Sequence, residues 1–162
     1  MRLVISSLLL ALFGFFSEEV YAFQNSRCDF YRDLESSIPC GPTGYSAGYA
    51  EKYCEKFSSL DDGRTQQSLS ANGLKWRDKT LMCLQNTMKN YLTYEPELSC
   101  KKIKRFGFSS HAYCYLTNPY SICDLPVSDW KVIIKTIQAH DIMSFTGLAQ
   151  VYKVISKCTK SF

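Results

Sequence analysis

Hydrophobic residues recur with helical spacing over Gly73–Leu92, in the middle of this 162-residue chain. Leu74, Leu81 and Met88 follow one another at heptad spacing, and charged residues occupy other positions, so the segment has one apolar face. This pattern predicts a long amphipathic helix. Cys83 lies near the apolar face and makes the helix a candidate for covalent attachment to a neighbouring segment.

Two shorter helices are predicted before this segment. The first covers residues 26–38, with Asp29 in its first turn and Pro39 ending it. The second carries aromatic residues every four positions, which places them on one side of a helix. We interpret them as a packing stripe whose buried hydroxyl groups need hydrogen-bond partners, with a platform for a carbohydrate or an aromatic ligand as the alternative. These residues are Tyr45, Tyr49, Tyr53 and Phe57. The polar residues 58–72 predict a surface loop.

Three more helices are predicted after Pro96, over residues 109–118, 128–140 and 144–158. Ser109 begins the first, Ser128 caps the second, and a break falls at His140–Asp141. The last two helices predict an antiparallel hairpin, because only a short link joins them. Their expected apolar faces are Trp130, Ile133, Ile134 and Ile137, and Leu148, Val151, Tyr152 and Ile155. No β pattern competes, so the predicted fold is all-α: a single disulfide-stapled helical domain with a C-terminal helical hairpin.

The first residues follow the pattern of a secretory signal peptide. Arg2 precedes an apolar run over Leu3–Phe16, and a short polar stretch then ends at Ala22. The apolar run is shorter than the roughly 20 residues that a transmembrane helix needs. We therefore expect residues 1–22 to be removed and residues 23–162 to form one secreted domain.

The net charge of the chain limits the classes of partner that we expect it to bind. The formal net charge is +4, and removal of Arg2, Glu18 and Glu19 with the signal peptide raises it to +5. This mildly basic balance argues against a nucleic-acid partner. No later apolar stretch is long enough to span a membrane, and no Asn-x-Ser/Thr acceptor for N-glycosylation occurs.

All eight cysteines lie after the predicted signal peptide, and their number is even. In an oxidising compartment this predicts four disulfides. A zinc site is the weaker interpretation, because the chain has no Cys-x-x-Cys pair and only two histidines. Eight cysteines can pair in roughly a hundred ways, so spacing alone leaves the pairing open. The cysteines are Cys28, Cys40, Cys54, Cys83, Cys100, Cys114, Cys123 and Cys158.

A basic cluster follows the long helix and consists of Lys101, Lys102, Lys104 and Arg105. Such a cluster is a candidate anion-binding site for the sulfate groups of a glycosaminoglycan. The alternative is an ordinary solvated helix face.

The two histidines do not form a recognisable catalytic site. The segment at His111 has the histidine of a secreted phospholipase A2, but Ala112 stands where that enzyme requires an acidic ligand for calcium. We interpret His111 as a residue at the start of a helix. His140 and Asp141 are adjacent, and adjacent residues on a helix point about 100° apart, so we expect that they do not face each other. The sequence therefore predicts no enzyme, no cofactor and no metal site.

The residues from Cys40 to Cys158 resemble the stanniocalcins, a family of secreted hormones. The resemblance rests on the Tyr53–Phe57 segment, on Cys83-Leu84 in the long helix, and on Cys114-Tyr115. The steps from Cys100 to Cys114 and from Cys123 to Cys158 are also similar to those of the family. The resemblance to the stanniocalcins implies four disulfides: Cys28–Cys54, Cys40–Cys100, Cys83–Cys114 and Cys123–Cys158.

The resemblance also implies a function. Family members are extracellular signals that affect calcium and phosphate handling, and some inhibit metalloproteinases. We therefore expect a secreted stanniocalcin-like signalling protein that binds an extracellular protein or receptor through its helical surface. The family's interchain cysteine has no counterpart after Cys158, which leaves a non-covalent homodimer open. The alternatives are a small secreted hydrolase or lipid-active effector, and a structural or glycan-binding extracellular module.

Overall fold

The computed structural model describes residues 28–61, 68–117 and 119–159. All elements in this part of the chain are helical, and it contains no strand, which confirms the predicted all-α fold. The predicted signal peptide and residues 62–67 of the predicted loop at 58–72 lie outside the described residues. Much of the rest of that segment is helical instead of a loop, because Ser58 ends α3, Ser59–Asp61 form a 3-10 helix and α4 begins at Ala71. The helices are α2 (Asp29–Ser37), α3 (Glu51–Ser58), α4 (Ala71–Tyr94), α5 (Cys100–Leu116), α6 (Val127–Thr136), α7 (Ala139–Met143) and α8 (Phe145–Cys158).

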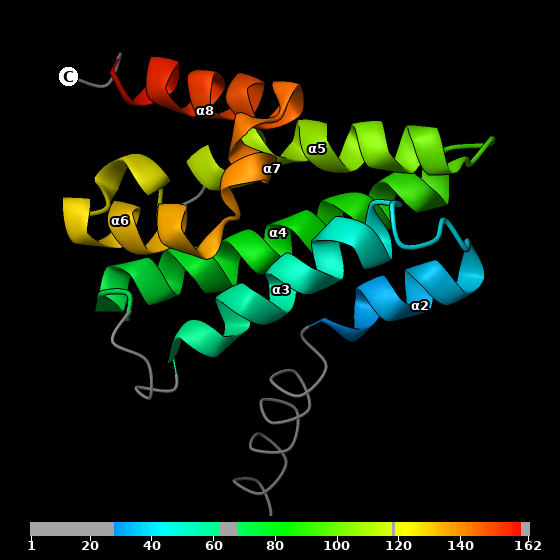
Figure 1. The fold of residues 1–162 in the computed structure, drawn as a ribbon, viewed down its shortest axis with the longest axis horizontal. Helices are drawn as coiled ribbons and strands as arrows, with labels where there is room; N and C mark the ends of the chain where they lie inside the picture. The colour runs from blue at the N-terminus through cyan, green and yellow to red at the C-terminus, as the bar shows by residue number, and fades with distance from the viewer. Residues whose placement is uncertain (1–27, 62–67, 118, 160–162) are drawn as a thin grey trace, which may run out of the picture.

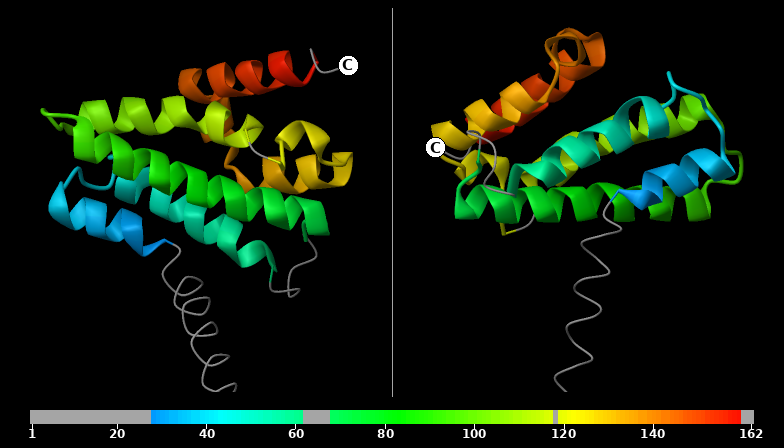
Figure 2. Two further views of the ribbon diagram at one scale, coloured as in Figure 1. Left: turned by 180° about the vertical axis from the view of Figure 1, so that it is seen from behind. Right: turned by 60° about the horizontal axis from the view of Figure 1, so that its bottom comes forward.

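The long predicted helix is α4, and it lies at the centre of the fold (Figure 1). It begins two residues before the predicted start, because the Ser70 hydroxyl accepts a hydrogen bond from the amide of Gly73 at 3.1 Å. Helix α5 lies beside α4, and α8 lies on the other side of α5 (Figures 1 and 2). Helices α2 and α3 line a core with α4 and α5, and the turn before α3 packs on α5, where Tyr45 lies against Gly107.

The core has two clusters that share α4. One gathers side chains from α2, α3, α4 and α5, including Tyr31, Leu81 and Ile103. The other gathers Trp76 of α4 with residues of α6 and α8, including Ile133 and Val154. The apolar face of α4 therefore serves both halves of the domain.

The helix predicted to begin at Ser109 begins instead at Cys100, so this prediction is wrong. The Ser99 hydroxyl caps α5 by accepting from the amide of Lys102 at 3.3 Å. The hydroxyls of Ser109 and Ser110 donate to carbonyls three residues earlier, at 2.8 Å each, as serines inside a helix do. A serine pair that resembles a start signal is thus compatible with an uninterrupted helix.

Helix α6 begins at Val127 with Pro126 as its N-cap, so the prediction of Ser128 as the cap is wrong. The carboxylate of Asp129 is buried and accepts two hydrogen bonds from Ser70. One comes from the Ser70 amide at 2.9 Å and the other from its hydroxyl at 2.6 Å. These bonds fasten α6 to the start of α4.

The break after α6 also differs from the prediction. It falls at Ile137 and Gln138, because the Gln138 amide donates to the Tyr53 hydroxyl at 3.1 Å instead of continuing the helix. His140 and Asp141 belong to α7, which links α6 to α8. The chain reverses through α7, so the C-terminal hairpin has a short helix as its link, and α8 packs mainly on α5 and α7.

The first part of the aromatic stripe lies in a π-helical turn at Ser46–Ala50. In this turn the amide of Ala50 donates to the carbonyl of Tyr45 at 2.8 Å. Tyr45 and Tyr53 are buried, and Tyr49 and Phe57 are partly buried against the core. The stripe therefore packs inward, as the packing interpretation expects.

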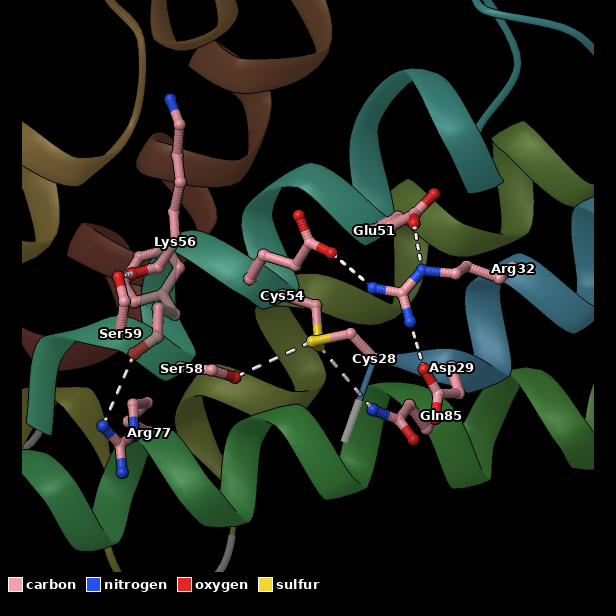
Figure 3. The surroundings of a disulfide bond; sticks show 12 residues. Cys28, Asp29, Arg32, Glu51, Cys54, Lys56, Ser58, Ser59, Arg77 and Gln85 are labelled. Carbon is pink, nitrogen blue, oxygen red and sulfur yellow. Dashed lines mark hydrogen bonds and ion pairs between the residues drawn. A yellow bond between two sulfur atoms is a disulfide. The ribbon is translucent and has the colours of Figure 1, made fainter. Parts of the chain in front are cut away.

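Four disulfides staple these helices, and they are the pairs that the stanniocalcin resemblance implies. Cys28–Cys54 ties the start of α2 to α3, beside an exposed cluster in which Arg32 contacts Asp29, Glu51 and Glu55 (Figure 3). Cys83–Cys114 joins α4 to α5, and Cys123–Cys158 joins the segment before α6 to the end of α8. Each layer of the fold is thus covalently attached to a neighbour.

Candidate functional site

Helix α8 carries an apolar face whose residues all remain exposed. Ser144 caps the helix by accepting from the amide of Gly147 at 3.0 Å, which starts a regular helix at Phe145. Apolar residues then recur every three or four positions along the outer side. We call this the α8 face; it consists of Phe145, Leu148, Val151, Tyr152 and Ile155.

The exposure of this face is large. Phe145 is 92% exposed and Tyr152 is 74% exposed. A whole aromatic side chain buries roughly 150–250 Å², so we estimate that the five side chains present on the order of 600 Å². Isolated surface apolar residues are ordinary, whereas a contiguous patch of this size is at the upper end for a monomer, and such patches are often functional.

The sequence predicted that Leu148, Val151, Tyr152 and Ile155 form an apolar face of the last helix, and in the structure this face is exposed. The inward side of α8 is formed by Val154, which is buried in the core, and by Gln150, whose Oε1 lies 3.1 Å from Nδ1 of His111. Helical spacing identifies an apolar stripe but does not say what covers it. The sequence analysis also missed Phe145, although it continues the same spacing by one turn.

The α8 face is held in place from three directions. The Cys123–Cys158 disulfide fixes the end of α8. Gln150 fixes its middle against His111. Its start is fixed through α7, where the Tyr53 hydroxyl donates to the Asp141 carboxylate. A surface supported in this way is preformed, which lowers the entropic cost of binding a partner.

His111 lies in the interior of α5 and is not the helix-start residue that the sequence predicted. Its ring packs between Tyr49 and Tyr115, with centroid distances of 5.7 and 5.6 Å. Burial lowers the pKa of His111 to about 4. The imidazole is therefore neutral at physiological pH.

A small cavity of about 40 Å³ adjoins His111 and is also lined by Tyr45, Arg77 and Thr80. This volume suffices for about three water molecules. The buried Thr80 hydroxyl has no hydrogen-bond partner among the residues that the structure describes, so we interpret the space as a hydrated internal cavity. Its size suits solvent better than an organic substrate.

His140 and Asp141 contact each other, contrary to the prediction from their adjacent positions. His140 Nε2 lies 3.2 Å from Asp141 Oδ1, and both residues belong to the short helix α7. The other Asp141 oxygen accepts from Tyr53, and burial together with this bond raises the pKa of Tyr53 to about 12. These contacts attach α7 to α3 and leave His140 largely exposed.

The predicted basic cluster is divided between two sides of α5. Lys101, Lys104 and Arg105 have the spacing of one helix face, and the Lys104 ammonium donates to the carbonyl of Thr43 at 3.2 Å. The Lys102 ammonium turns away and lies 2.8 Å from the Glu95 carboxylate, which raises the pKa of Lys102. The structure therefore brings together three of the four predicted anion-binding residues.

The described residues contain neither a cluster of metal ligands nor a helix that could span a membrane. In residues 28–61, 68–117 and 119–159, no three His, Cys, Asp or Glu side chains converge as metal ligands. No helix in the same ranges combines the length and hydrophobicity that crossing a membrane requires.

Comparisons with protein-family models, with curated proteins and with solved structures give no match for this chain.

Proposed function

We propose that this chain is a secreted, stanniocalcin-like signalling protein that acts by binding another extracellular protein or receptor through the α8 face. The observation that carries the proposal is the uncovered apolar stripe on a helix that is otherwise firmly attached. Protein interfaces concentrate aromatic residues at their centres, and Phe145 and Tyr152 are the most exposed members of this face. An apolar helix stripe of this kind fits a hydrophobic groove on a partner.

Secretion and hormone activity rest on further observations. The four disulfides are typical of proteins from oxidising compartments, and the first 22 residues follow the signal-peptide pattern. The pairing of the cysteines agrees with the pairing that the stanniocalcin resemblance implies. Effects on calcium and phosphate handling follow from that resemblance alone, so they are part of the proposal.

The test is binding of the labelled, disulfide-bonded protein to intact cells, measured by flow cytometry. The α8 variant is Leu148→Ser with Tyr152→Ser, and the matched control is Val127→Ser with Ile134→Ser, which replaces two exposed apolar side chains of α6. We expect at least a tenfold loss of saturable binding for the α8 variant, because truncating two central interface residues commonly costs more than about 1.4 kcal/mol. Equal binding by the wild type and the α8 variant would exclude this face as the binding surface.

The partner of the α8 face can also be a second copy of the chain, which gives the non-covalent homodimer left open above. Helical residues beside the stripe, such as Ala149 and Ser156, carry no charge, so two copies would not repel each other there. Sedimentation equilibrium distinguishes the two cases. A dimer that the α8 variant abolishes identifies a second copy, and a monomer with retained cell binding identifies a different protein.

Glycosaminoglycan binding is a second candidate function, favoured by the shared face of Lys101, Lys104 and Arg105. Several cations on one face attract a sulfated chain, and salt weakens this attraction. We expect the triple variant Lys101→Ser with Lys104→Ser and Arg105→Ser to elute from a heparin column at lower salt than the wild type. Unchanged elution would assign these residues to the solvated surface.

A further inference from the structure

A second aromatic surface lies between α4 and α5 and is separate from the α8 face. It is a shallow, wide-open groove with a volume of about 590 Å³. Its residues on α4 recur at helical spacing, and two aromatic residues of α5 form the opposite wall. The groove is lined by Thr87, Asn90, Tyr91, Tyr94, Glu95, Phe106 and Tyr113.

The groove has an aromatic floor and two raised ends. The rings of Tyr91 and Phe106 stack with a centroid distance of 3.9 Å and an interplanar angle of 8°, which closes the bottom. Tyr94 at one end is 83% exposed, and Tyr113 at the other is 60% exposed. Two large aromatic side chains thus extend into solvent on either side of a flat apolar surface.

The groove is fixed before any ligand arrives. The Cys83–Cys114 disulfide joins the two helices below one end, and the Thr87 hydroxyl lies 3.9 Å from each of its sulfur atoms. At the other end, Lys102 of α5 pairs with Glu95, which follows α4. Ligand binding therefore requires no rearrangement of the two helices.

The polar groups of the groove can donate hydrogen bonds to acceptors on a ligand and can also accept them. The carboxylate that lines it, Glu95, is already paired with Lys102 at 2.8 Å. The Asn90 amide is exposed and has donors to offer, as do the hydroxyls of Tyr94 and Tyr113. A charged ligand finds no unpaired charge within the lining itself.

From this combination we propose that the α4–α5 groove binds a proline-rich segment of a partner protein in the polyproline II conformation. Proline rings pack on aromatic side chains, and the carbonyls of such a segment are acceptors without internal partners. One turn of polyproline II is about 9 Å long. The span from Thr87 to Tyr94 along α4 is about 10 Å, from the rise of an α-helix, so one turn fits between the raised ends.

The groove and the α8 face can be occupied independently. His111, which supports α8, and Tyr113, which lines the groove, point to roughly opposite sides of α5. They are two positions apart, and residues at that spacing in an α-helix are rotated by about 200° about its axis. A test of the groove therefore does not depend on the proposed function of α8.

The experiment is fluorescence anisotropy with a fluorescein-labelled ten-residue oligoproline and the disulfide-bonded protein. A Gly/Ser peptide of the same length and label is the control probe, and unlabelled chitohexaose and oligoproline are the competitors. The groove variant is Tyr94→Ala with Tyr113→Ala. The matched control is Tyr152→Ala, because it removes an equally exposed tyrosine from the α8 face. Circular dichroism verifies that each variant is folded.

We expect saturable binding of oligoproline, at least a tenfold weaker affinity for the groove variant, and an unchanged affinity for Tyr152→Ala. The variant Tyr94→Phe with Tyr113→Phe should lose about threefold, since it keeps the rings and removes two donors. Absence of oligoproline binding at millimolar protein would overturn the proposal. Equal affinities of the wild type and the groove variant for oligoproline would also overturn the proposal. Competition by chitohexaose at a lower concentration than by unlabelled oligoproline would overturn it as well.

Discussion

The Nε2 atom of His111 lies 3.2 Å from the hydroxyl oxygen of Tyr45, and both side chains are buried. The Nδ1 atom of the same ring lies 3.1 Å from Oε1 of Gln150. An amide oxygen only accepts, so Nδ1 carries the proton and Nε2 accepts from Tyr45. This neutral imidazole joins three separate parts of the chain, and its protonation would remove the acceptor that Tyr45 uses.

The first prediction concerns pH. Burial lowers the pKa of His111 from 6.5 to about 4 in the folded protein, so between these values the unfolded chain binds more protons. Stability should be complete above pH 6.5 and fall as the pH is lowered toward 4, by at most about 1.4 kcal/mol per pH unit. Urea unfolding at pH 7.5 and pH 4.5 measures this loss. The variant His111→Gln should lose about 2 kcal/mol less than the wild type over that interval, and an equal loss would contradict the assignment.

The second prediction concerns Gly107 in the middle of α5. A Cβ atom at this position would lie 2.3 Å from Cζ of the Tyr45 ring, which is buried. Replacing glycine by alanine inside a helix usually adds stability, but Gly107→Ala should cost about 1–3 kcal/mol through overpacking. Thermal unfolding measures the change, with Ser109→Ala as a control on the exposed side of the same helix. A Gly107→Ala protein as stable as the wild type would show that Tyr45 does not rest on this glycine.

The third prediction separates the two sides of α8. Leu148→Ser with Tyr152→Ser changes exposed residues and should alter the free energy of unfolding by about 0.5 kcal/mol or less per substitution. Val154→Ala, two positions after Tyr152 and on the buried side of α8, should cost about 2 kcal/mol through a cavity in the core. Urea unfolding of the disulfide-bonded protein compares them. A large loss for the Leu148 and Tyr152 pair would mean that this face packs against the protein's own chain.

The fourth prediction concerns the Cys123–Cys158 disulfide, which closes a segment of 35 residues. In the chain-entropy model, its removal by Cys123→Ser with Cys158→Ser should cost about 4 kcal/mol. Because this bridge holds the end of α8, trypsin should cleave at Lys153 and Lys157 sooner than at Lys89 in α4. Limited proteolysis followed by mass spectrometry measures the order of cleavage. Simultaneous cleavage at all three sites would indicate that α8 and the core unfold together.

The regular, strongly patterned parts of the chain could be predicted from sequence. Heptad spacing predicted α4 almost to its ends, and the helix predicted over residues 144–158 is α8, because both segments have strong helical periodicity. Capping residues, another local signal, predicted helix starts at Ser109 and Ser128 that are wrong. Serine inside a helix and serine at a cap look alike when the partner of the hydroxyl is unknown.

The candidate sites required the tertiary structure. The sequence identified Leu148, Tyr152 and their neighbours as apolar but could not say that the helix would turn Val154 and Gln150 inward. It grouped Lys102 with Lys101 by proximity, although Glu95 draws Lys102 to another side of α5. The groove between Tyr94 and Tyr113 has no local signal, because its walls lie nineteen positions apart in the sequence.

By itself, therefore, the sequence determined the helical class, the main helices and the even set of eight cysteines. Periodicity, caps and composition are local properties that a single segment expresses without its neighbours. Only the tertiary structure decided which apolar stripe became core and which stayed uncovered, where His111 found its partners, and how α4 and α5 enclose an aromatic groove. These outcomes depend on which segments meet in space, and that depends on packing across the whole domain.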